Sequence, residues 1–348
     1  MDESPTTLVL GAAGFLGVNL VDALLARGSR PRCGHRARTN LIPLRRRGVP
    51  LVLADTAEPP SLAAAFSGVE VVFHLAGHYP RDGRTPEETR ARAVSELSTV
   101  LDAAAHAGVR RVVLVSSTAT VAPRDDGRPS TEADVFPEEP AIGAYHAAKW
   151  SMEQLVLDED RLETIVVCPG ACLGPWDLRV GTSALLVATA RGLDPVHPDG
   201  VVSPVDVRDV ARALTTLSTS SAPPRRVVVA GESLRLQRLL EQLSARYGVA
   251  PPGAPLSDVA ARAFADREEE RVAGTASRAS LAREIVDLVV HGAVIDAQLG
   301  ASFVPGGLTP LSETLDAFDA FARRMRLIPE RSASPDPKDP KHAQHDLR

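Results

Sequence analysis

The stretch Gly11-Ala12-Ala13-Gly14-Phe15-Leu16-Gly17 decides the fold, because it joins a strand pattern to a helix pattern. The apolar run Thr7–Leu10 precedes it and predicts a strand, while apolar residues at helical spacing follow from Leu16 to Leu24. Glycines in such a turn let the backbone approach a pyrophosphate, and the first N–H groups of a helix attract phosphate. We therefore predict a dinucleotide-binding turn. The spacing differs by one residue from G-x-G-x-x-G, and a plain tight turn is the alternative.

Further short apolar runs alternate with helix patterns over the first 170 residues. These runs show little period-2 alternation, which is typical of strands buried on both faces of a parallel sheet. They are Val49–Ala54, Val69–Leu75, Arg111–Val115 and Thr164–Cys168. Repeated strand–helix–strand units predict an α/β fold with a doubly wound parallel sheet and right-handed crossovers.

The pattern changes near residue 170, where proline and glycine become frequent and helical stretches then dominate. We predict a dinucleotide-binding domain over residues 1–170 and a smaller, mostly helical substrate-binding lobe over residues 171–328. One strand, at about residues 225–230, is predicted to return to the main sheet. Residues 329–348 contain four prolines and many charges, so we predict a disordered tail that buries too little apolar surface to fold.

Composition excludes several classes of protein. The 348 residues are 44% hydrophobic with a net charge of −5, which is ordinary globular usage and argues against general nucleic-acid binding. Three cysteines suggest no disulfide framework and favour a reducing compartment. The most apolar region, residues 285–304, carries Asp287, His291 and Asp296, so we expect no membrane span. We expect a cytoplasmic protein without a metal site.

The segment after the second strand indicates which dinucleotide is bound. An Asp or Glu there usually holds the ribose 2′-hydroxyl of NAD, but the segment Cys33–Arg38 contains no acid and two arginines. A guanidinium suits a 2′-phosphate, so Arg36 favours NADP(H) over NAD(H); a solvated basic loop is the alternative. Asp55, just past the third strand, could accept from the adenine amino group or merely cap the surface.

Tyr145 and Lys149 stand four residues apart in a predicted helix. Residues i and i+4 share one helix face, so the phenol and the ammonium can converge on one ligand. A neighbouring cation favours the phenolate and makes tyrosine a better proton-transfer group at a carbonyl. The pattern Y-x-x-x-K is common by accident, but its place before the last main strand makes it informative.

Three hydroxyl residues, Ser116, Ser117 and Thr118, follow the strand Arg111–Val115. Open α/β sheets bind ligands at the carboxyl ends of their strands, so a hydroxyl there could bond a substrate oxygen. A polar loop that only caps the strand is the alternative.

Taken together, these motifs resemble the extended short-chain dehydrogenases/reductases, over about residues 6–326. Within that group the chain most resembles the dihydroflavonol-4-reductase-like branch. The segments that carry the resemblance are GAAGFLG, HLAG at His74–Gly77, SSTATV, YHAAK, Cys168–Asp177 and VDVRDVA at Val205–Ala211.

The resemblance implies a Rossmann sheet and a triad in which Tyr145 is the general acid/base, Lys149 binds the nicotinamide ribose and tunes Tyr145, and Thr118 is the third hydroxyl. The oligomeric state stays open; the usual dimer of the family that the chain resembles packs two long helices across a two-fold axis, so a homodimer is one possibility. Positions expected to contact the cofactor, besides Tyr145 and Lys149, are Gly11, Ala13, Gly14, Phe15, Leu16, Gly17, Arg36, Asp55, Leu75, Ala76, Gly77, Pro169 and Ala171.

The expected activity is an NADP(H)-dependent oxidoreductase that interconverts a ketone or aldehyde and an alcohol on a small, apolar molecule. Two alternatives remain: an epimerase or dehydratase of a sugar-like substrate that retains its NAD, and a non-catalytic NADP-binding scaffold. Sugar-nucleotide epimerases usually carry an Arg shortly before the V-x-V-x-D-V segment. This chain has Val202-Ser203-Pro204 instead, which disfavours a sugar nucleotide.

Overall fold

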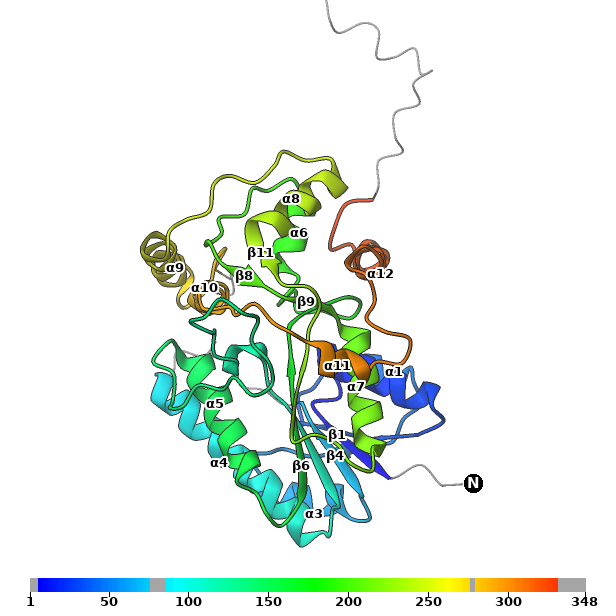
Figure 1. The fold of residues 1–348 in the computed structure, drawn as a ribbon. Helices are drawn as coiled ribbons and strands as arrows, with labels where there is room; N and C mark the ends of the chain where they lie inside the picture. Colours follow the sequence, from blue (N-terminus) through cyan, green and yellow to red (C-terminus); the bar gives the residue numbers. More distant parts are fainter. Residues whose placement is uncertain (1–5, 76–84, 276–278, 331–348) are drawn as a thin grey trace, which may run out of the picture.

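A seven-stranded parallel sheet lies at the centre of the computed structural model, which describes residues 6–75, 85–275 and 279–330 (Figure 1). The strand order is β10-β6-β5-β4-β1-β2-β3. The first three strands are added outward from β1 on one side, and β4, β5, β6 and β10 are added on the other side, so the order reverses between β1 and β4. The predicted doubly wound α/β fold is therefore confirmed. Its strands are β1 (Thr7–Leu10), β2 (Arg32–His35), β3 (Leu51–Leu53), β4 (Val71–His74), β5 (Arg111–Val115), β6 (Glu163–Pro169) and β10 (Arg226–Val229).

Helices cover both faces of this sheet. On one face lie α3 (Pro59–Phe66), α4 (Pro86–His106) and α5 (Ala144–Leu157); on the other lie α1 (Phe15–Ala26), α2 (Ile42–Arg45) and α7 (Val207–Thr219). Alternate strand residues join opposite core clusters, as Leu8 packs toward α4 while Val9 packs toward α1. Burial of both faces is the physical reason why the strands are nearly continuous apolar runs.

The second half of the chain adds a mostly helical layer above the carboxyl edge of the sheet (Figure 1). Strand β10 and helix α7 instead belong to the sheet layer, since β10 pairs with β6 and α7 packs beside α1. The other helices of this half are α6 (Ala184–Ala190), α8 (Leu236–Tyr247), α9 (Asp258–Val272), α10 (Arg283–Val290), α11 (Gln298–Ser302) and α12 (Leu311–Arg324).

Two small sheets in this half were not predicted. Strand β7 (Ala171–Leu173) pairs with β9 (Pro204–Asp206), and β8 (Val201–Val202) pairs with β11 (Leu234–Arg235). Strands of two or three residues leave no periodic signal in a sequence. Helix α8 begins only at Leu236, because the two residues before it pair with β8.

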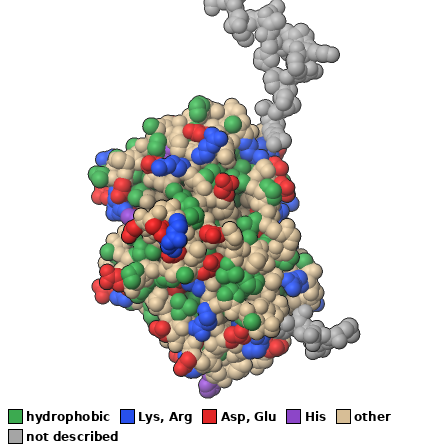
Figure 2. All heavy atoms as spheres, in the orientation of Figure 1, with side chains coloured by type: hydrophobic (Ala, Val, Ile, Leu, Met, Phe, Trp, Pro, Cys, Tyr) green, Lys and Arg blue, Asp and Glu red, His purple; other side chains and the backbone are tan. Residues whose placement is uncertain are grey.

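Within the described ranges, no helix has the length and apolar character needed to cross a membrane. Figure 2 shows acidic and basic side chains interspersed over both halves of one face, with hydrophobic side chains between them. Most of the predicted disordered tail, residues 331–348, lies outside the described residues.

The glycine turn sets how closely α1 approaches β1. Gly11 has a φ of +83°, a left-handed conformation that favours glycine, and its carbonyl accepts the N–H of Gly14 at 3.0 Å. A Cβ added to Gly17 would lie 2.3 Å from the Gly11 carbonyl oxygen and 2.7 Å from the backbone of Ala12. Both obstacles are backbone atoms, so no side-chain rotation could relieve the collision.

Replacing Gly17 by Ala is therefore expected to push α1 away from β1 and to lower the free energy of unfolding by about 3 kcal/mol. Gly14→Ala is the matched control: its Cβ would lie 3.2 Å from the same oxygen, and we expect a loss of about 1 kcal/mol or less. Urea unfolding followed by circular dichroism measures both variants. Equal losses would show that the close approach at Gly17 is not the constraint.

Candidate active site

Tyr145 and Lys149 lie on one face of α5 and are both buried, with 6% and 5% of their surfaces exposed. Gly143 caps the helix in an extended conformation, which places Tyr145 in its first turn. The Lys149 Nζ donates a hydrogen bond of 3.0 Å to the carbonyl of Val115, the last residue of β5. The same nitrogen lies 5.9 Å from the centroid of the Tyr145 ring. The ammonium therefore sits between the phenol and the carboxyl end of the sheet.

Burial governs the charge of Lys149. Desolvation lowers the pKa of its ammonium from 10.5 to about 8, while the negative charges of Glu153 and Glu284 oppose that shift. Lys149 thus stays protonated at neutral pH with little margin. A cation held against a phenol in this way favours the phenolate, the form that can accept a proton.

The three candidate hydroxyls follow β5 directly and enter a short 3₁₀ helix, η1 (Thr118–Thr120), that packs against α5. Ser116 is buried, and its Oγ has no hydrogen-bond partner among the described residues. The Ser117 Oγ accepts the N–H of Ala119 at 3.1 Å, and Thr118 is half-buried at the start of η1. The structure thus brings the hydroxyl segment beside the helix that carries Tyr145 and Lys149.

The start of α1 fits a phosphate group. The first hydrogen bond into the helix runs from Val18 to the Gly14 carbonyl, and the N–H groups of Phe15, Leu16 and Gly17 find no acceptor among the described residues. The first turn of α1 carries no acidic side chain, so the positive end of the helix dipole is not neutralised there.

Arg36 follows β2 at the same edge of the sheet and is exposed. Its backbone closes a turn with Thr39, and its guanidinium makes no ion pair or hydrogen bond with the part of the chain that the structure describes. Asp55 follows β3, where its Oδ1 accepts the N–H of Ala57 at 3.1 Å. Leu75 donates its N–H to the Leu10 carbonyl at 3.0 Å, beside the glycine turn. Ala76 and Gly77 lie outside the described residues.

The turn Pro169-Gly170-Ala171 is fixed at the end of β6. Gly170 donates to the Val229 carbonyl at 3.0 Å, and Ala171 donates to the Ser203 carbonyl at 2.9 Å. A Cβ on Gly170 would lie 2.2 Å from the same Ser203 oxygen, so this turn is tightly packed. Since β5 and β6 are neighbours, the turn and the hydroxyl segment end at the same edge.

One signal in the sequence went unused in the prediction of this site. The chain has 39 lysines and arginines in total, but only three are lysines: Lys149, Lys338 and Lys341. Lys149 is thus the only lysine among the described residues. A buried ammonium shifts its pKa readily, whereas a guanidinium stays charged and needs several acceptors. An isolated lysine in an arginine-rich chain therefore points to a site that needs an ammonium.

Comparison with known proteins agrees with this arrangement: residues 7–231, well over half of the chain, match the NAD dependent epimerase/dehydratase family. The chain belongs to the NAD dependent epimerase/dehydratase family. The predicted resemblance to the extended short-chain dehydrogenases/reductases is thereby confirmed.

This family member is similar to proteins with reductase names. It is 29% identical over 255 residues to a putative dihydroflavonol 4-reductase of Synechocystis sp., covering 70% of this chain and 73% of that protein. It is 32% identical over 271 residues to cinnamoyl-CoA reductase 1 of Oryza sativa subsp. japonica, covering 70% and 78%. Its fold matches the crystal structure of gox2253 with a TM-score of 0.79 at 26% identity, covering 94% of this chain and 100% of that one.

The buried charge of Lys149 makes the stability of this family member depend on pH. Because the pKa of Lys149 is about 8 in the folded chain and 10.5 for a solvated lysine, the unfolded chain binds more protons between these limits. Stability then rises with pH across this window, and the cost of burying the charge is present in full below pH 8.

Lys149→Met is accordingly expected to raise the free energy of unfolding by about 2 kcal/mol at pH 7, after the loss of one hydrogen bond. This gain should shrink between pH 8 and 10.5, where the folded lysine loses its proton first, and most of it should be lost by pH 10.5, where half of the unfolded lysines are also neutral. Urea unfolding followed by tryptophan fluorescence at both pH values measures the difference, with Lys149→Arg as the control that keeps the charge. A Met variant that is less stable at both pH values would contradict the argument.

Proposed function

We propose that this chain is an NADP(H)-dependent oxidoreductase that interconverts a ketone or aldehyde and an alcohol on a small molecule. One observation carries the proposal: Tyr145 and Lys149 lie buried on one face of α5, beside the hydroxyl segment and at the sheet edge that holds the glycine turn. The reductase names of the relatives support oxidoreduction, and the apolar character of the chain's motifs gives no sign of a sugar nucleotide.

Each residue has a defined part in this proposal. The N–H groups at the start of α1 bind the pyrophosphate, and Arg36 binds the 2′-phosphate of the adenosine ribose. Lys149 binds the nicotinamide ribose through its ammonium. NADP(H), when bound, supplies or accepts the hydride. Tyr145 gives the proton to the carbonyl oxygen during reduction or takes it from the alcohol during oxidation, and Thr118 donates a hydrogen bond to the same oxygen.

The family name itself favours a second candidate, an epimerase or dehydratase that retains its NAD and returns the hydride. The same three residues could serve that chemistry, so the site does not separate the two. Stoichiometry does: a reductase consumes one NADPH for each alcohol formed, and an epimerase consumes none. A chain that binds cofactor but converts no substrate would be the non-catalytic scaffold.

Tyr145→Phe is expected to lower kcat by about 10²- to 10⁴-fold, because it removes the proton donor and keeps the ring. The Kd for NADPH should stay within about twofold, because no other cofactor contact changes. The assay follows NADPH absorbance with a panel that includes a dihydroflavonol, a hydroxycinnamoyl thioester and simple aliphatic ketones. Thr118→Val tests the third hydroxyl, with Ser117→Ala as its control. Full turnover by the Phe variant would overturn the proposed mechanism.

Arg36→Ala tests the cofactor preference. Loss of one charge-assisted hydrogen-bonding group should weaken NADPH binding by about 10- to 100-fold and leave NADH binding unchanged. Isothermal titration calorimetry with both nucleotides measures the two constants, and Arg38→Ala provides the control for loss of a nearby positive charge. Equal binding of NADPH and NADH by the unaltered chain would contradict the preference for NADP(H).

A further inference from the structure

Glu153 lies one helical turn beyond Lys149 on α5 and is completely buried, with none of its side chain exposed. Its Oε2 accepts a hydrogen bond of 2.9 Å from the Nε of Arg226, a residue of β10 that is 8% exposed. Removing two charges from water is expensive, and apolar residues of similar size often give equal or greater stability. Stability alone therefore does not explain why a buried ion pair lies beside the candidate triad.

The pair contacts the hydroxyl segment through Thr120, which is also completely buried. The Thr120 Oγ1 lies 2.5 Å from the Glu153 Oε1 and 2.8 Å from the Ser117 carbonyl, and it accepts from the Arg226 Nη2 at 2.9 Å. A hydroxyl has one proton to donate, and the carboxylate is the stronger and closer acceptor. Thr120 is thereby bonded to both members of the pair.

Helix α5 is thus tied to the segment 115–120 at two levels. Lys149 bonds to the carbonyl of Val115 before the three hydroxyl residues, and Glu153 bonds to Thr120 after them. Ser116, Ser117 and Thr118 lie between these two anchors. Their distance from Tyr145, which is carried by the same helix, is fixed by both.

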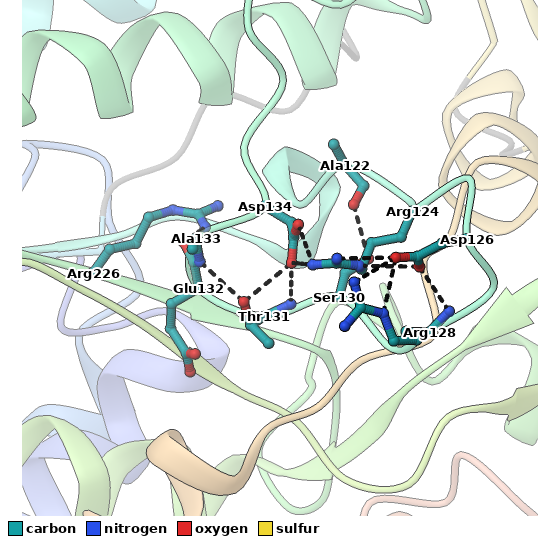
Figure 3. A network of polar contacts seen from close by, with 10 residues as sticks. All are labelled: Ala122, Arg124, Asp126, Arg128, Ser130, Thr131, Glu132, Ala133, Asp134 and Arg226. Carbon is teal, nitrogen blue, oxygen red and sulfur yellow. Dashed lines mark hydrogen bonds and ion pairs between the residues drawn. The ribbon is translucent and has the colours of Figure 1, made fainter.

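Arg226 also holds the loop that follows η1, residues 122–135. Its Nη1 donates to the Glu132 carbonyl at 2.6 Å, and the Glu132 Oε1 accepts the Val228 N–H at 3.2 Å. Figure 3 shows Arg226 at one end of this loop and the contacts among Arg124, Thr131 and Asp134 that stabilise the loop itself. One guanidinium therefore joins β10, α5, η1 and this loop.

We propose that Glu153 and Arg226 are positioning residues that fix Lys149 and the hydroxyl segment relative to Tyr145. The inference rests on the proposed function, because it assumes that Tyr145 and Lys149 act on a substrate. Glu153 also supplies negative charge to Lys149 from within the same helix, and Glu284 of α10 supplies it from outside that helix. Burial raises the pKa of the Cys168 thiol of β6, which therefore stays neutral. Replacing Glu153 by a neutral residue would remove a charge that raises the pKa of Lys149, so desolvation would lower that pKa further.

Glu153→Gln tests the proposal through Lys149 itself. Protein labelled with ¹³C-lysine gives signals from three residues only, and Lys149→Met assigns that of Lys149. We expect the pKa of Lys149 to fall by about one unit in Glu153→Gln, because a nearby opposite charge is lost. In a plot of kcat against pH, the loss of activity at high pH should shift to lower pH by the same amount. The titration needs no cofactor or substrate.

Glu163→Gln is the matched control. Glu163 of β6 accepts a hydrogen bond of 2.6 Å from the buried Arg111 of β5, so it also belongs to an ion pair, here between two neighbouring strands. It lies at the amino end of β6, opposite the edge that carries the triad. We expect this variant to lose stability and to leave the titration of Lys149 unchanged. An unchanged Lys149 titration in Glu153→Gln as well would reduce the buried pair to a structural role and overturn the proposal.

Thr120→Val keeps the ion pair and removes only its bond to the hydroxyl segment, which provides a second test if Glu153→Gln does not fold. We expect kcat to fall about tenfold with an unshifted Lys149 titration; unaltered kcat would overturn the positioning role. Failure of the proposed function is distinguishable, because Tyr145→Phe would then retain full turnover while the lysine titration still reports on Glu153.

Discussion

All seven strands of the main sheet run in the same direction, so each one ends at the same edge. This constraint brings together residues that are far apart in the chain: the glycine turn after β1, Arg36 after β2, the hydroxyls after β5 and the Pro169 turn after β6. The strand order reverses between β1 and β4, and open α/β sheets bind ligands at the carboxyl edge beside such a reversal. The shared direction of the strands thus determines where the candidate site lies, and the side chains at that edge determine what it can bind.

The parts of the fold that could be predicted are those with a local physical signal. Strands buried on both faces read as apolar runs, and Gly17 is required by contact with a carbonyl only six residues away. The small sheets β7–β9 and β8–β11 could not be predicted, because their partners are short and carry no pattern. The Glu153–Arg226 pair could not be predicted either, since 73 residues separate its members and nothing local marks Glu153 as buried.

The choice between lysine and arginine separates two kinds of buried cation. Arg111 and Arg226 each bond to several acceptors at once; Arg111 reaches both oxygens of Glu163 and the carbonyls of Leu217 and Ser218. A planar guanidinium with five donors is suited to such a junction and remains charged there. Lys149 donates a hydrogen bond to the carbonyl of Val115, and its pKa of about 8 lies close to neutral pH. Among the described residues, lysine therefore stands where the charge can change near neutral pH, and arginine stands where one cation bonds to several acceptors.

The second half of the chain also reaches the start of α5. The carboxylate of Asp287 in α10 lies so close to Gly143 that an added Cβ would come within 2.6 Å of it, which places negative charge at the positive end of the helix dipole. His146, next to Tyr145, is buried against His291, and desolvation lowers the pKa of its imidazole to about 4, so it stays neutral at physiological pH. Helix α5 is therefore held at its start by α10 and further along by β5, η1 and β10. The orientation of Tyr145 depends on both halves of the chain, although α10 and β10 carry none of the motifs that predicted the site.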